Sequence, residues 1–124
     1  MSTASGTLIA ESLRVGSTLR GVPIAIDAIA RADRGDMTAG QPRTWTLLEF
    51  RVDVDELDAL AEKLSDLLDD RFGWYCDFRS RDETFVVFAG KVFRYPRGDR
   101  TGRARATEHA RSVGVPERQL DWPE

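Results

Sequence analysis

Apolar and polar residues alternate along two segments in the first half of the chain. Residues 21–32 and 44–52 carry apolar side chains at nearly every second position, which predicts two β-strands. Ile29 breaks the alternation in the first segment, so residues 25–32 form either a strand with a bulge or a short helix. The regular alternation before Ile29 favours the strand.

Leucines and alanines spaced three and four residues apart predict a helix over residues 54–70, with Asp53 as its N-cap. Residues 74–95 then predict three short strands joined by tight turns. The middle strand is apolar on both faces, which is typical of a strand that is covered on both sides. A second helix is expected after Asp99 or Thr101.

The remaining segments have weaker patterns. Residues 1–6 are small and polar and are predicted to be disordered, and a short helix is expected over residues 7–14. Residues 33–43 are rich in Gly and Pro and predict a mobile loop. Together these elements predict one α+β domain over residues 7–124. Its curved antiparallel sheet has about five strands, in the order ββαβββα after the N-terminal helix, with the helices packed mainly on one face.

Composition narrows the class of protein. The chain has 124 residues, of which 41% are hydrophobic, and this suffices for one globular core. Cys76 is the only cysteine, which is typical of a reducing compartment. The longest apolar run, residues 85–89, is too short to span a membrane, and the first residues lack the features of a secretory signal. We therefore expect a cytoplasmic protein without membrane contact.

No sequence motif points to catalysis. His109 is the single histidine, Cys76 has no neighbouring base, and the glycine motifs that bind phosphates are absent. Carboxylates such as Asp77 and Asp82 are the only support for an enzyme, and their geometry cannot be read from the sequence. The pattern favours a protein that is not an enzyme and that uses neither a cofactor nor a metal.

Charge is distributed unevenly along the chain. Residues 1–70 carry 13 acidic and 7 basic side chains, whereas residues 71–124 carry 8 acidic and 11 basic ones. An acidic surface can recognise a basic protein. Our leading hypothesis is therefore a non-enzymatic binding or interaction module with a protein partner, for example of the inhibitor or immunity type.

The alternative hypothesis is a site for a small anionic ligand or a phosphate within the segment from Arg94 to Arg105. A helix N-terminus with arginines around it can bind an anion, and the candidate residues are Arg94, Tyr95, Arg97, Arg100 and Arg103. The competing interpretation is that these arginines pair with acidic side chains on a solvated surface. The net charge of −3 argues against binding to nucleic acid.

Trp45 and Leu47 lie on the face of their predicted strand that the predicted helices do not cover. A homodimer could bury this second face of the sheet, or the chain itself could cover it. The sequence leaves both explanations open.

The patterns GKVFRYPRGD at residues 90–99 and GVPERQLDW at residues 114–122 support a resemblance. They resemble a group of small uncharacterised proteins from high-GC, actinobacterial genomes. This resemblance extends over most of the chain and implies no functional residues.

Overall fold

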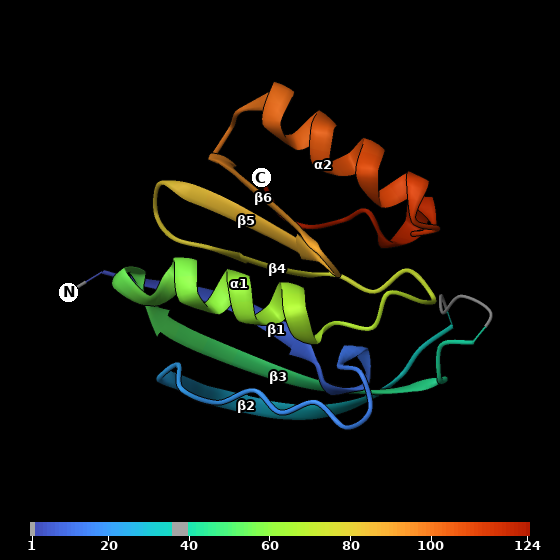
Figure 1. Cartoon of the computed structure of the whole chain (residues 1–124). Coiled ribbons are helices and arrows are strands. Elements are labelled where there is room, and N and C mark those ends of the chain that lie inside the picture. The colour runs from blue at the N-terminus through green and yellow to red at the C-terminus, as the bar shows by residue number, and fades with distance from the viewer. Residues whose placement is uncertain (1, 36–39) are drawn as a thin grey trace.

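The computed structural model describes residues 2–35 and 40–124, and this part of the chain forms one open antiparallel sheet with two α-helices (Figure 1). The strands, in the spatial order β2-β3-β1-β4-β5-β6, are β1 (Thr3–Ile9), β2 (Ile24–Asp33), β3 (Thr44–Asp53), β4 (Cys76–Arg79), β5 (Glu83–Phe88) and β6 (Lys91–Pro96). The helices are α1 (Leu57–Leu67) and α2 (Arg100–Ser112). The predicted α+β class and antiparallel sheet are confirmed, with six strands instead of about five.

The prediction for the N-terminal segment is wrong. Residues 3–9 are not disordered or helical but form β1, which lies between β3 and β4 in the middle of the sheet. Only Ala10–Ser12 makes a short 3₁₀ turn. The core side of β1 carries Ala4, Gly6 and Leu8, and the small residues Ala4 and Gly6 give little hydrophobic signal in the sequence.

Small residues are required in β1 because β4 approaches it closely. A Cβ atom added at Gly6 would lie 2.7 Å from the Cβ of Phe78 and 2.6 Å from the backbone oxygen of Asp77. Neither atom belongs to the flexible end of a side chain, so neither can move aside easily. Gly6 therefore allows β1 and β4 to pair.

The predicted strand at residues 25–32 is confirmed, because β2 includes these residues and pairs with β3. The register shifts between Ile26 and Ala28, as expected for a bulge. The predicted meander and both later helices are also present, and Asp99 caps α2 by accepting a hydrogen bond from the N–H of Thr101. Of the predicted loop at residues 33–43, positions 36–39 lie outside the described residues.

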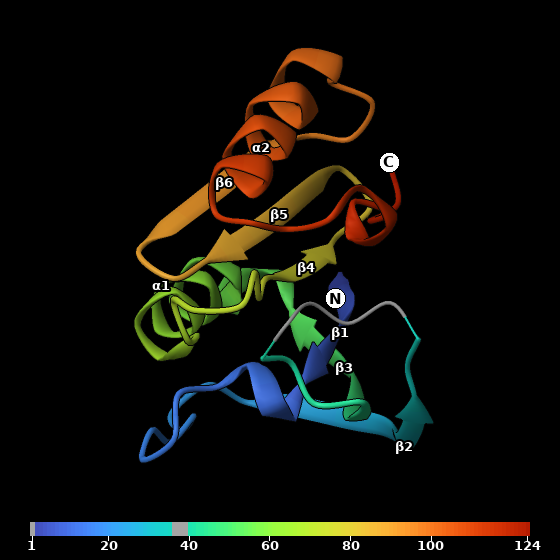
Figure 2. The same ribbon diagram turned by 90° about the vertical axis from the view of Figure 1, so that its right-hand side faces the viewer.

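The helices lie on opposite faces of the sheet, which corrects the prediction that they share one face. Phe85 and Val87 of β5 belong to the core under α1, whereas Val86 and Phe88 belong to the core under α2. The sheet curves around α1, and α2 lies on the other side over β5 and β6 (Figures 1 and 2). The predicted cover on both faces of the middle strand is thus confirmed.

The second face of the sheet, opposite α1, is covered over only part of its width. α2 and the segment that follows it pack on β5 and β6, while Thr7, Ala30 and Glu49 of the other strands remain exposed there. Trp45 on this face is only 4% exposed because Trp74 packs against it, with ring centroids 5.3 Å apart. The chain itself therefore covers Trp45. A homodimer through Trp45 and Leu47 stays a prediction, but it is not needed to bury Trp45.

The described helices are all too short or too polar to cross a membrane.

The close contact at Gly6 generates a prediction. Gly6→Ala should lower the free energy of unfolding by about 1–3 kcal/mol, because the added methyl group overpacks the contact between β1 and β4. Urea denaturation measures the change. Ser5→Ala, at the exposed neighbouring position, is the matched control and should change stability by less than about 0.5 kcal/mol. Equal stability of the two variants would contradict the proposed contact.

Candidate functional site

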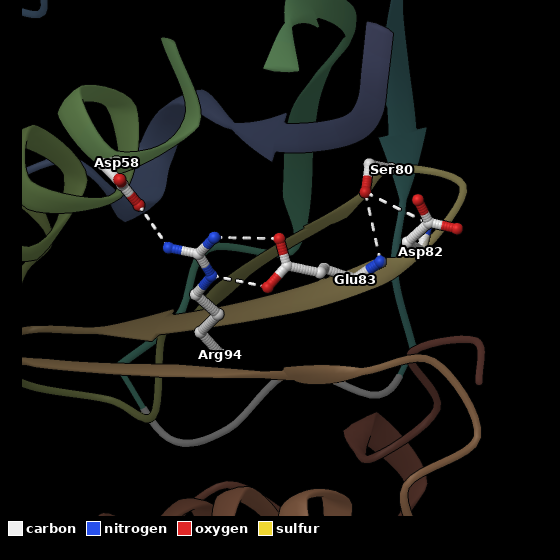
Figure 3. A network of polar contacts seen from close by, with 5 residues as sticks. All are labelled: Asp58, Ser80, Asp82, Glu83 and Arg94. Atoms are coloured by element: carbon white, nitrogen blue, oxygen red, sulfur yellow. Dashed lines mark hydrogen bonds and ion pairs between the residues drawn. The ribbon is translucent and has the colours of Figure 1, made fainter. Parts of the chain in front are cut away.

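Arg94 forms ion pairs with two carboxylates on the α1 side of the sheet. Its guanidinium group lies 2.6 Å from a carboxylate oxygen of Glu83 and 2.8 Å from one of Asp58 (Figure 3). Arg94 is paired in register with Phe85, whose side chain belongs to the core under α1. This arginine is therefore part of an ion-pair network between β5, β6 and α1.

The other predicted ligand-binding residues lie elsewhere. Tyr95 is buried under α2, and Arg97 donates long hydrogen bonds to the backbone oxygens of Glu124 and Ser80. Arg100 is exposed on α2, and the Arg103 guanidinium group stacks on the ring of Trp122 at 4.9 Å. The structure does not bring the five residues together, because Arg94 and Arg103 are on opposite faces. The anionic-ligand site stays a prediction without a convergent set of side chains.

A groove of about 340 Å³ is present on the second face of the sheet. Its floor is formed by side chains from β3, β1 and β4, where the cover by α2 ends. Residues 119–123 form one wall. They belong to the segment that follows α2 and runs back across the sheet (Figure 2). The groove is the best candidate site because polar groups from distant parts of the chain meet there. The residues that line the groove include Thr7, Ile9, Arg34, Trp45, Leu47, Trp74, Asp77, Arg79, Asp121 and Trp122.

Strand alternation sets the polar part of the floor. Asp77 and Arg79 are two residues apart on β4, so both side chains point away from the α1 core. Ser5 is in register with Arg79, and the same antiparallel register places Thr7 of β1 beside Asp77. A carboxylate, a guanidinium group and a hydroxyl group therefore share one surface in the middle of the sheet.

Hydrogen bonds from aromatic side chains hold the wall in place. The hydroxyl group of Tyr75 donates to the backbone oxygen of Gln119, and the indole N–H of Trp122 donates to the Tyr95 hydroxyl oxygen at 2.9 Å. Burial raises the pKa of Tyr75, so this hydroxyl group keeps its proton. These contacts fix Asp121 at the rim of the groove.

Asp77 and Arg79 on the groove floor form an open ion pair, in which the two groups are neighbours without a close contact. The closest atoms of Asp77 and Arg79 are 3.6 Å apart, whereas the other ion pairs among the described residues have distances between 2.5 and 3.0 Å. Both side chains are mostly buried, with 23% of Asp77 and 28% of Arg79 exposed. Within the described part of the chain, the Arg79 guanidinium group donates no hydrogen bond. Two charged groups thus face the groove with unused hydrogen-bonding capacity.

The environment of Asp77 favours its neutral form. Burial raises the pKa of its carboxyl group to about 6, against the opposing effect of the Arg79 charge. The carboxylate of Asp121 raises this pKa further, and the positive charge of Arg103 lowers it. At neutral pH the carboxylate is therefore ionised at a cost in free energy.

The sequence identified only part of this site. Asp77 was considered as a carboxylate of unknown geometry, and Asp82, considered with it, lies exposed in the turn before β5, outside the groove. Arg79 and Asp121 were not predicted as site residues. The alternation that puts Asp77 and Arg79 on one face of a buried strand was a usable signal, but nothing in the sequence placed Asp121 beside them.

Cys76 and His109, the other two residues considered for catalysis, are packed against the surrounding structure. Cys76 faces the α1 core and is 2% exposed, and burial raises the pKa of its thiol. The His109 ring packs against Phe88 and Phe93, and burial lowers its pKa. Among the described residues, no group of three or more His, Cys, Asp or Glu side chains could hold a metal ion.

Comparisons with family models, with curated proteins and with solved structures give no match. The resemblance to small actinobacterial proteins therefore stays a prediction. The interpretation of the groove depends on its own geometry.

The raised pKa of Asp77 predicts a pH-dependent gain in stability for Asp77→Asn. Above about pH 6 the folded wild-type protein holds a disfavoured charge that the variant lacks, so the variant should be more stable at pH 7 by about 1–3 kcal/mol. Near pH 4 the carboxyl group in the folded protein is protonated, and the gain should disappear. Urea denaturation from pH 4 to pH 7 measures this difference.

Asp27→Asn is the control, because Asp27 lies at the edge of the same face and its hydrogen bonds from Arg51 lower its pKa. This variant should gain no stability at pH 7. A loss of stability in Asp77→Asn at pH 7 would show that the carboxylate is not disfavoured in the fold.

Proposed function

We propose that this protein is a non-enzymatic binding module that holds a small polar molecule in the groove between β1, β4 and residues 119–123. The volume of about 340 Å³ is at the lower end of the range for small-molecule pockets. The groove combines apolar floor residues with charged groups of both signs, as such pockets commonly do.

The open pair of Asp77 and Arg79 is the observation that carries this proposal. A mostly buried charge costs free energy unless hydrogen bonds and an opposite charge compensate for it. Here the two charges are neighbours, yet they remain 3.6 Å apart and face the groove. A ligand with complementary groups explains why the fold retains this arrangement.

The other two binding hypotheses have less support from the geometry. Several acidic side chains of the first half are neutralised by arginines, including Asp27 by Arg51 and Asp58 by Arg94. This reduces the acidic surface that a basic protein partner would recognise. The arginine segment, for its part, is divided between two faces of the sheet. The groove brings its groups together, and it is therefore the site we propose.

A second candidate function is acid–base catalysis by Asp77. One observation favours it: a pKa of about 6 is close to the value that suits proton transfer near neutral pH. If Asp77 is catalytic, a compound that binds in the groove should be converted by the wild-type protein and recovered unchanged from Asp77→Asn. For a binding module, the compound is recovered unchanged from both.

The proposed function predicts that filling the groove abolishes binding. A set of amino acids, amines, carboxylates, sugars and nucleosides is screened by ligand-observed NMR against the wild-type protein and Thr7→Phe. Thr7 is an exposed floor residue, so the larger side chain should occupy the groove without disturbing the core. We expect at least one compound to bind to the wild-type protein and to lose its binding in this variant.

The matched control is Thr3→Phe, which places the same side chain on the same strand and face but outside the groove. It should bind the compound as the wild-type protein does. Binding that survives in Thr7→Phe, or the absence of any bound compound from the whole set, would refute the groove as a binding site.

A further inference from the structure

The groups that line the groove define a chemical class of ligand. We propose that the ligand is a free α-amino acid with an apolar side chain, whose ammonium group binds between Asp77 and Asp121 and whose carboxylate binds Arg79. This inference rests on the proposed function and specifies it.

The groove lining carries equal numbers of positive and negative side chains. Asp77 and Asp121 supply two carboxylates, and Arg34 and Arg79 supply two guanidinium groups. The lining therefore presents charges of both signs, and a ligand with a single charge would match only one of them. A zwitterion is neutral overall and can still offer a charge of the correct sign to each side.

The open ion pair has the spacing that such a ligand needs. The ammonium and carboxylate groups of an α-amino acid are attached to one carbon atom, so they must meet acceptors and donors that lie side by side. Asp77 and Arg79 are neighbours on one face of β4, with closest atoms 3.6 Å apart. Arg79 presents a fork of N–H donors, which suits a carboxylate, and none of these donors is used within the described part of the chain.

A further positive charge lies next to the groove wall. The Nη1 atom of Arg103 is buried and has no hydrogen-bond partner among the described residues. The Arg103 guanidinium group stacks on Trp122 of the groove wall, and its charge influences Asp77. The positive charge of Arg103 near Asp77 is therefore favourable for a ligand that brings a carboxylate.

The remaining lining favours an apolar side chain over a sugar or a nucleobase. Ile9 and Leu47 form a cross-strand pair next to Thr7, and both are partly exposed on the floor. Trp45, Trp74 and Trp122 are only 4%, 5% and 2% exposed, so they offer almost no ring face for stacking. An aliphatic or aromatic side chain of the ligand can lie along the floor instead.

Isothermal titration calorimetry tests the class with L-leucine and L-phenylalanine as probes. Leucinamide keeps the ammonium group without the carboxylate, and N-acetyl-L-leucine keeps the carboxylate without the ammonium group. We expect a free amino acid to bind at least about tenfold more tightly than either analogue of leucine. Equal binding of leucinamide or of N-acetyl-L-leucine would overturn the assignment, because one charged group would then contribute nothing.

Substitutions test the proposed contacts of the ligand with Arg79 and with Asp77. Arg79→Met and Asp77→Asn should each weaken binding of the amino acid by about tenfold or more, and Asp77→Asn cannot do so by unfolding if it is the more stable protein at pH 7. Arg51→Met is the matched control, since Arg51 lies on the same face in a closed pair with Asp27. Undiminished binding in Arg79→Met would overturn the carboxylate contact.

The compound screen distinguishes a wrong ligand class from the failure of the groove as a binding site. If neither amino acid binds while other polar compounds do, and Thr7→Phe abolishes that binding, the ligand class is wrong and the groove is still a binding site. If no compound of either set binds, both proposals fail.

Discussion

The fold depends on the close pairing of β1 with β4 in the middle of the sheet. β1 is hydrogen-bonded to β3 on one side and to β4 on the other, so it joins the β2–β3 hairpin to the β4–β6 meander. Gly6 makes this possible because any side chain at its position would overpack the contact with Phe78. Without β1, each of the two parts would expose an additional unpaired strand edge.

The groove follows from the way the two helices share the sheet. α1 occupies one face, and α2 with the segment after it covers the other face only over β5 and β6. β4 lies at the boundary, so its outward side chains are neither solvated like a surface nor enclosed like a core. Asp77 and Arg79 lie at this boundary. Their incomplete pairing therefore depends on the partly covered position of β4 as well as on the two residue types.

Strong periodicity explains what the sequence could predict. α1 and the meander each repeat one pattern over enough residues to predict the element type. In β2, the break in alternation at Ile29 left a short helix as the alternative, and it also marked the bulge that the structure shows. β1 was missed because close packing selects small residues, which remove the hydrophobic signal from a buried strand. Small residues such as Ala4 and Gly6 led to the prediction of a disordered terminus.

The candidate site was less predictable for a related reason. Alternation along residues 74–79 already separated Asp77 and Arg79 from the apolar face, and this part of the site was within reach of the sequence. Asp121 was not, because its position depends on where the segment after α2 returns. The helix faces were mispredicted likewise, since both faces of β5 are apolar and either could accept α2.

The groove is built from segments that lie far apart along the chain, namely residues 7–9 of β1 and residues 119–123. On the ribosome, β1 is made before β3 and β4, and the loops that bring these strands together close at a cost in chain entropy. The sheet can be complete once β6 has emerged, whereas the groove also needs the wall that follows α2. A molecule held there would stabilise only chains in which this last segment has docked, and its occupancy would therefore report the completion of folding.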